Sequence, residues 1–319
     1  MKVDRLLYLD IGKFVGAFIV TWSHCAQCVS GMIWTNFLGG RQIDIAFTMP
    51  LFMIMSGWFI NLDKMRKTPM CDYVKAKFKR LIIPSFMWYF VLLLLTLNMP
   101  DLSLFTYYWY LNALFVCLCL IMICSKFTKN DLICCFVSTS FILFIPYSDY
   151  SHINYMIPFL WAGYGLRKIF KLDFAPIIVI ICAIIGICLC PFWNFTNSVY
   201  LSPFNSYCLN YKMVLIMVFR FIIGFAISAV IVFVIFRMEH MRINKIAPYG
   251  SYSLVIYTAS LAFLGFFSSV LNYLHFHTNR LVLIDFVSLF LCLCIIITTI
   301  RFADFCKKRK RMRQLFLGE

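Results

Sequence analysis

Long apolar segments recur along the chain, and short polar segments separate them. In windows of about 20 residues, the length that crosses a hydrocarbon core as an α-helix, this pattern predicts about ten spans. They lie near residues 9–28, 43–60, 81–98, 107–124, 132–147, 153–169, 174–192, 213–236, 250–272 and 281–303. The pattern therefore predicts an all-α fold, namely a polytopic transmembrane helical bundle.

Composition supports a membrane protein. Of the 319 residues, 63% are hydrophobic and only 13% are charged, whereas a soluble domain is about half apolar and about a quarter charged. This excludes a water-soluble fold. No extramembrane segment is long enough for a second domain, so we expect a single integral-membrane domain over residues 1–319, multi-pass in the cell (inner) membrane.

The basic residues indicate the orientation. The formal net charge is +16, and placing the N-terminus in the cytoplasm puts 24 of the 29 Lys and Arg residues on the cytoplasmic side. Cytoplasmic loops of membrane proteins carry such an excess, so both termini and a basic tail at about 304–319 are expected inside. This asymmetry explains most of the net positive charge, and membrane lipid is an expected partner of the basic residues. We therefore infer no nucleic-acid partner.

Three ionisable residues fall in the first predicted span, where they are energetically unfavourable and usually face a cavity or a partner. Lys13 and His24 are eleven residues apart, close to three helical turns, so both project from one face about 16 Å apart along the axis. Asp10 lies near the same face. A histidine is suited to act as a general base, and a lysine to hold an anion. Alternatively, Asp10 and Lys13 form an ion pair and His24 bonds a neighbouring helix.

Other polar features leave alternatives open. Arg220, in a long apolar run, suits either a phosphate or carboxylate ligand or a snorkelling interfacial position. The predicted outer loop at about 193–212, with Trp193 and Asn197, could stack on a sugar or only anchor the interface. Most of the 15 Cys residues lie in apolar runs, typical of small residues in membrane helices. No metal site is expected, because His275 and His277 lack accompanying ligands.

Two segments carry specific motifs. The first runs from Tyr8 through Lys13 to His24, and the second from Phe47 through Met-Pro-Leu-Phe to Ser56 and Gly57. The first resembles a signature of the integral-membrane acyltransferase 3 family, in which ten residues separate a basic residue from a histidine. The second resembles the second-helix pattern of the same family, particularly of its shorter sugar O-acetylases. Weaker matches follow in family order at 79–84, 109–111 and 159–168. Many members continue from the segment 250–257 to a histidine near position 260, where this chain has Ser260.

The resemblance implies transfer of an acetyl or larger acyl group, with acetyl-CoA as the cosubstrate. The implied acceptor is a hydroxyl of a cell-envelope or exported polysaccharide, or of its lipid-linked precursor. We expect His24 and Asp10 to be catalytic, with His24 as the general base, and Lys13, Arg80 and Arg220 to bind the donor. Two other hypotheses remain: a transporter or flippase for a glycan or lipid, and a non-catalytic membrane partner in glycan assembly.

Overall fold

The computed structural model describes residues 7–31, 42–96, 107–143, 152–199, 210–237, 247–274 and 280–318, and every regular element within them is helical. This confirms the all-α prediction. The chain forms two compact units. Unit 1 comprises Met1–Asp44, Lys79–Tyr108 and Met238–Glu319, and unit 2 comprises Ile45–Phe78 and Trp109–Arg237. The expectation of one membrane domain over residues 1–319 stays a prediction.

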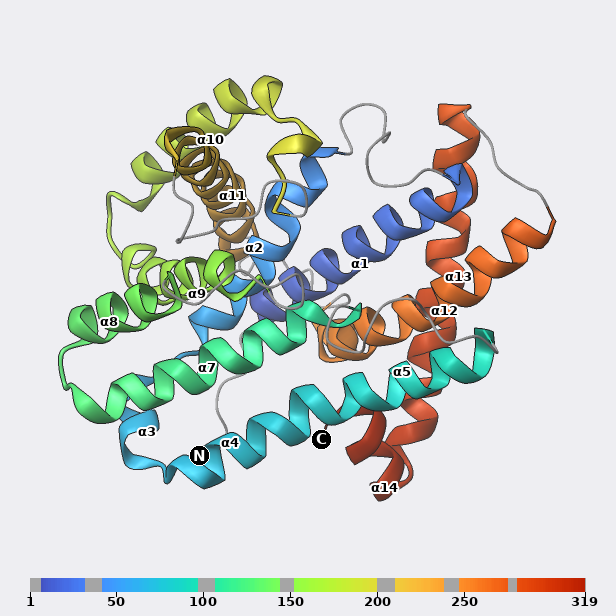
Figure 1. The fold of residues 1–319 in the computed structure, drawn as a ribbon, viewed down its shortest axis with the longest axis horizontal. Coiled ribbons are helices and arrows are strands. Elements are labelled where there is room, and N and C mark those ends of the chain that lie inside the picture. The colour runs from blue at the N-terminus through green and yellow to red at the C-terminus, as the bar shows by residue number, and fades with distance from the viewer. Residues whose placement is uncertain are drawn as a thin grey trace. The chain divides into compact units, whose positions relative to one another are not determined.

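The helices follow the apolar segments of the sequence (Figure 1). The α-helices are α1 (Leu7–Ser30), α2 (Gln42–Trp58), α3 (Leu62–Lys67), α4 (Met70–Lys77), α5 (Ile83–Thr96), α7 (Trp109–Phe127), α8 (Asp131–Leu143), α9 (Ile153–Ile169), α10 (Ala175–Leu189), α11 (Tyr211–Arg237), α12 (Ser253–Tyr273), α13 (Leu281–Lys307) and α14 (Lys310–Met312). Short 3₁₀ or π segments are η2 (Phe78–Ile82), η3 (Cys190–Phe192), η4 (Phe195–Asn197), η6 (Ala247–Tyr252) and η7 (Arg313–Leu317).

Six helices in the described part of the chain are long and apolar enough to cross a membrane. They are Met70–Thr96, Trp109–Phe127, Ala175–Phe192, Tyr211–Arg237, Pro248–Tyr273 and Val282–Lys307, and each overlaps one predicted span. The protein is therefore an integral, multi-pass membrane protein. Helix α1 is long enough but carries three ionisable side chains, and α2, α8 and α9 are shorter. The count of ten spans and the cytoplasmic termini stay predictions.

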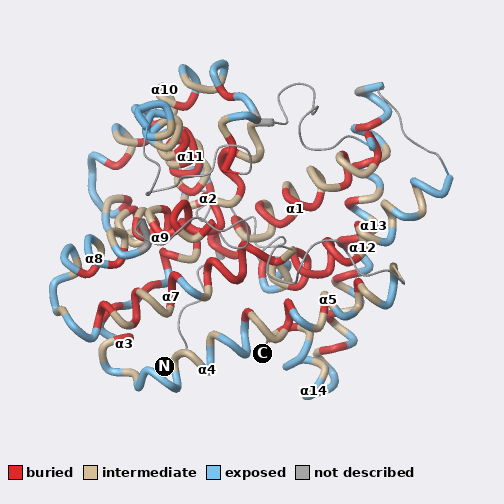
Figure 2. The backbone as a smooth tube through the Cα atoms, in the orientation of Figure 1, coloured by how far each residue is buried: buried red, intermediate tan, exposed pale blue. Residues whose placement is uncertain are grey.

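Burial differs sharply among these helices, as Figure 2 shows. Most of α7 is buried, whereas only 22% of the apolar stretch Ala175–Phe192 is buried within the structure. The exposed side chains of α10 are large and apolar and recur three or four residues apart, on one face of the helix: Ile177, Ile180, Ile181, Ile184 and Ile187. Such a face is stable in hydrocarbon but not in water, which fits a lipid-facing surface.

In unit 1, α1 packs against α12 and α13, and α12 also packs against α5 (Figure 1). The basic tail folds back onto this group. The Phe316 ring lies 5.5 Å from the ring of Trp88 and 5.3 Å from that of Phe302, centroid to centroid. Gly318, at φ +68°, lies so close to Arg80 that a Cβ would come within 2.5 Å of the Arg80 carbonyl oxygen. The C-terminal segment is thus anchored by aromatic packing and by a glycine in the left-handed region.

In unit 2, helices α2 and α9 touch backbone to backbone. A Cβ on Gly57 would lie 1.9 Å from the carbonyl oxygen of Leu160, and a Cβ on Gly163 would lie 1.9 Å from that of Ile54. Only glycine fits at either position. Small residues give membrane helices this close approach, because van der Waals packing replaces the hydrophobic effect there. The Ser-Gly pair that ends the second motif is therefore part of a helix crossing.

Charged residues of unit 2 gather at the start of α8. Asp131 pairs with Arg66 at 2.8 Å and Lys168 at 3.5 Å, and it accepts a hydrogen bond from the Tyr164 hydroxyl. Burial alone would raise the pKa of Asp131, but the hydrogen bonds from Tyr164 and Arg66 outweigh it and lower the pKa below its ordinary value. This cluster ties α3, α8 and α9 together.

Candidate functional site

Helix α1 carries three of the predicted site residues on one uninterrupted helix. It runs from Leu7 to Ser30 without proline, so the spacing argument for Lys13 and His24 applies: both lie on one face, about 16 Å apart along the axis. The Asp10 residue is 8% exposed, and Lys13 and His24 are half-buried. The structure thus provides the scaffold that the sequence predicts for a line of polar groups.

Asp10 and Lys13 contact each other directly. The Lys13 Nζ lies 3.4 Å from Oδ1 of Asp10, and the two side chains are 27% and 11% exposed. The contact expected for a pair three residues apart on a helix is therefore present. The short helix η6 packs on α1 at this point, since a Cβ on Gly250 would lie 2.1 Å from the Asp10 carbonyl oxygen. The backbone of Asp10 is thus packed against η6, while part of the Lys13 side chain stays accessible.

His24 lies further along α1 and makes a hydrogen bond that defines its chemistry. Its Nδ1 is 3.2 Å from Oε1 of Gln27, one turn later. An amide oxygen only accepts hydrogen bonds, so Nδ1 carries a proton in this contact, and in the neutral ring the lone pair is then on Nε2. That tautomer presents Nε2 as a base. Sequence reasoning did not single out Gln27, although an amide three residues after a histidine on a helix is a recognisable signal.

Neighbouring elements fix the orientation of α1 around His24. The Trp22 indole nitrogen donates to Oγ of Ser288 on α13 at 3.0 Å, and Oγ of Ser23 donates to Oδ2 of Asp44 at 2.9 Å. Asp44 lies in the first turn of α2 and was not selected from the sequence, although a carboxylate in a predicted span is a signal in itself. These bonds flank His24 on the chain and restrict rotation of the helix that carries it.

The other predicted donor-binding residues lie elsewhere. Arg80 belongs to unit 1, in η2, and is exposed. Arg220 belongs to unit 2, on α11, and is only 2% exposed. Its Nε donates to the Asn197 carbonyl at 2.9 Å and its Nη2 to the Ser198 carbonyl at 3.3 Å. The structure therefore brings Asp10 and Lys13 into contact, places His24 on the same helix, and gives Arg220 backbone partners.

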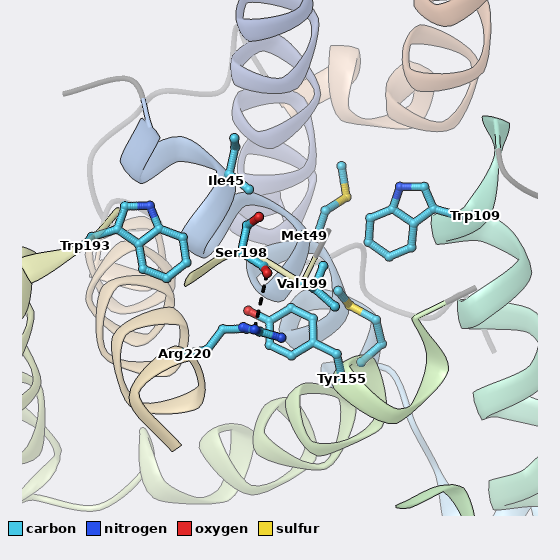
Figure 3. Close-up of a pocket in the computed structure, with 9 residues that line it drawn as sticks. Ile45, Met49, Trp109, Tyr155, Trp193, Ser198, Val199 and Arg220 are labelled. Carbon is cyan, nitrogen blue, oxygen red and sulfur yellow. Dashed lines mark hydrogen bonds between the residues drawn. The ribbon is translucent and has the colours of Figure 1, made fainter. Parts of the chain in front are cut away.

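A pocket in unit 2 surrounds Arg220 (Figure 3). The pocket is small, with an internal volume of about 10 Å³, room for about one water molecule. Figure 3 shows the indoles of Trp109 and Trp193 on either side and the guanidinium of Arg220 beside the Tyr155 ring. The lining residues are Ile45, Met49, Trp109, Tyr155, Met156, Trp193, Ser198, Val199 and Arg220. Of these residues, the sequence indicated only Trp193 and Arg220 as candidates for ligand binding. The others come from distant parts of the chain, and no spacing pattern in the sequence groups them.

Among the described residues, no cluster of metal-binding side chains is present, and position 260 carries a serine. Throughout the seven described segments, no three His, Cys, Asp or Glu side chains are grouped to hold a metal ion; His275 and His277 lie outside those segments. Ser260, at the position where many family members have histidine, is fully buried and donates to the Tyr257 carbonyl at 2.9 Å. Its hydroxyl is bonded within its own helix and is not a base.

The sequence model of the acyltransferase 3 family, described as an acyltransferase domain, matches residues 6–301. The chain belongs to the acyltransferase 3 family. This confirms the resemblance predicted from the first two motifs, and it makes the protein a membrane acyltransferase with an acyl donor and an acyl acceptor. The match covers both units almost completely. No curated protein and no solved structure matches the chain.

Proposed function

We propose that the protein transfers an acetyl group from acetyl-CoA to a hydroxyl of a cell-envelope or exported polysaccharide, or of its lipid-linked precursor. Donor and acceptor class follow from the resemblance to the sugar O-acetylases of the family. The observation that supports the proposal best is the layout of α1. One helix carries an accessible cation, Lys13, and a base with a defined tautomer, His24, about 16 Å apart along its axis.

The proposed reaction is a direct acyl transfer with His24 as the general base. Nε2 of His24 takes the proton of the sugar hydroxyl as the oxygen attacks the thioester carbonyl. The new ester C–O bond forms, the C–S bond breaks, and the proton passes to the departing thiolate to give CoA. Gln27 holds the protonated Nδ1, which leaves the lone pair of the neutral ring on Nε2. Positioning both reactants on one helix removes much of the entropic cost of the bimolecular step.

Donor binding is proposed for the Lys13 end of the helix. Lys13 would hold a phosphate of the donor, Asp10 would keep the ammonium group in place, and the pantetheine arm would run along α1 towards His24. The 27% exposure of the Lys13 side chain supports access by an anion. Arg80 is a further phosphate contact in this proposal, since it is exposed in the same unit. Arg220 is the weaker candidate, because it already donates to two carbonyls.

The test measures O-acetyl groups on surface and lipid-linked glycans by mass spectrometry. Cells carry the intact gene, a deletion, or expression-matched variants. His24→Ala should lose the product with the protein still present, by the factor of about 10² to 10⁴ that a general base contributes. Lys13→Ala should chiefly raise the KM for acetyl-CoA. As a control, Ser260→Ala should keep activity. Normal acetylation by a well-expressed His24→Ala variant would refute the proposal.

A further inference from the structure

The short helix η6 places an exposed aromatic ring beside the start of α1. The Tyr249 ring lies 5.8 Å from the ring of Phe14, centroid to centroid, and Phe14 directly follows Lys13. One residue later, the backbone of Gly250 touches that of Asp10. Tyr249 is nevertheless 42% exposed. An aromatic ring that is fixed on one side and open on the other offers a flat face on which a nucleotide base stacks.

The last residue of η6 positions a cation. The Nζ of Lys307, at the end of α13, is 3.7 Å from the centroid of the Tyr252 ring. The Tyr252 hydroxyl donates to Oδ1 of Asp304, one turn before Lys307. Within the described part of the chain, no carboxylate forms an ion pair with Lys307. Its ammonium group is therefore oriented by an aromatic ring, and its charge can serve an anionic ligand.

The charges around η6 favour an anion. Lys13 has Asp10 as its acidic neighbour, and Lys307 has Asp304 one turn away. The residues that follow, 308–313, include five basic and no acidic side chains. All of these residues belong to unit 1. The corner formed by η6, the start of α1 and the end of α13 therefore carries an excess of positive charge, which attracts phosphates.

The proposed donor-binding mode determines which part of CoA reaches this corner. The pantetheine arm runs from Lys13 along α1 towards His24, so Lys13 holds the diphosphate to which the arm is attached. The rest of CoA is an adenosine with a phosphate on its 3′-hydroxyl, and it extends in the opposite direction. Helix η6 packs on α1 at Asp10, on the side of Lys13 away from His24. An exposed ring and a cation there match an adenine base and a phosphate.

We propose that Tyr249 and Lys307 form a subsite for the nucleotide end of CoA. The adenine base stacks on the Tyr249 ring, and the Lys307 ammonium group binds the 3′-phosphate. Tyr252 is a positioning residue, because its ring orients that ammonium group. The inference rests on the proposed function, which makes an acyl-CoA the donor. The subsite selects CoA over a donor that has the same pantetheine arm without the nucleotide.

The experiment compares two ligands that differ by one phosphate. Isothermal titration calorimetry measures the Kd of CoA and of 3′-dephospho-CoA for the full-length chain in lipid nanodiscs, without acceptor. The parent chain should bind CoA about three- to ten-fold more tightly, the effect of one charge-assisted contact that is partly exposed to water. Lys307→Gln should weaken CoA by that factor and leave 3′-dephospho-CoA unchanged. A preference for CoA that survives in this variant, or an equal loss of both ligands, would overturn the role of Lys307.

Lys310→Gln is the matched control, since it removes the same charge from an exposed lysine at the start of α14. It should keep the preference for CoA, because salt screens the field of an exposed charge within about 10 Å. Loss of the preference in both variants would mean that the summed charge of the tail attracts the phosphate, and it would overturn the specific contact with Lys307.

Two variants of Tyr249 test the stacking. Tyr249→Phe keeps the ring and should bind both ligands as the parent chain does. Tyr249→Leu removes the aromatic face and should weaken CoA and 3′-dephospho-CoA alike, about five-fold or more, because both contain the base. The melting temperature of each variant checks that the chain is folded. Equal binding by Tyr249→Leu and the parent chain would overturn the stacking.

The titrations and the transfer assay separate this inference from the proposed function. Binding of CoA without any preference over 3′-dephospho-CoA would refute the subsite and leave acetyl-CoA as the donor. Binding of neither ligand by the parent chain would refute the proposed donor, and the subsite with it. In the transfer assay, Lys307→Gln should raise the KM for acetyl-CoA with kcat unchanged, because the 3′-phosphate lies at the far end of the donor from the thioester. A lowered kcat with the same KM would contradict the subsite.

Discussion

The hydrogen bond between His24 and Gln27 allows the effect of a Gln27 variant on kcat to be predicted quantitatively. Gln27→Met keeps the length of the side chain and removes the acceptor, so Nδ1 loses the partner that fixes the tautomer. A neutral hydrogen bond of this kind contributes about 0.5–1.5 kcal/mol. At 1.36 kcal/mol for each factor of ten, kcat should fall about two- to ten-fold. The KM for the donor should stay the same, because Lys13 lies about 16 Å away.

The assay uses purified enzyme in nanodiscs with acetyl-CoA and a glycan acceptor, and it measures release of free CoA thiol. Gln27→Glu is the matched control, since it retains an acceptor at the same position and should keep kcat closer to that of the parent chain. Two results would contradict the reasoning. One is an unchanged kcat in Gln27→Met. The other is a loss as complete as that of His24→Ala, which would mean that Gln27 does more than orient the ring.

Two further predictions concern stability. Gly57→Ala places a Cβ 1.9 Å from a backbone oxygen and should lower the free energy of unfolding by about 1–3 kcal/mol. Gly165→Ala on α9, with nothing within 4 Å of its Cβ, should leave that free energy unchanged or raise it by up to about 1 kcal/mol. Melting curves in detergent compare the two variants. Asp131→Asn should lower stability near pH 7 by at most about 1 kcal/mol. Because the pKa of Asp131 is lowered in the folded chain, the stabilisation by its carboxylate is lost as the pH falls. The difference in free energy of unfolding between variant and parent should therefore shrink in acid. A difference that grows in acid would contradict this reasoning.

Much of the fold follows from the sequence because the bilayer imposes a single dominant pattern. Six of the predicted spans coincide with helices of sufficient length and apolarity. Helix α1 is not in this set, because Asp10, Lys13 and His24 reduce its apolarity, and neither is α9, which is only 17 residues long. Short helices can pack inside the protein instead of crossing the lipid, and hydropathy cannot distinguish the two cases.

The site could be predicted only where it lies on one helix. The contact between Asp10 and Lys13 follows from their spacing of three residues. The pocket in unit 2 does not follow, because Trp109, Tyr155 and Ser198 come from different parts of the chain and share no periodicity. The same applies to Gly57: the small residue is visible in the sequence, but its contact with the Leu160 carbonyl requires the crossing of two helices.

Lys13 and Arg220 are stabilised in different ways, and the difference bears on what each can do. Lys13 faces a carboxylate on its own helix and remains 27% exposed, so it can turn towards an incoming anion. Arg220 is 2% exposed and donates to two carbonyls, so a phosphate could bind it only at the expense of the segment that carries Ser198. Arg220→Lys keeps the charge but loses the planar fork. We therefore expect it to lower the melting temperature, with the KM for acetyl-CoA unchanged. A raised KM for acetyl-CoA alone would instead place Arg220 at the donor.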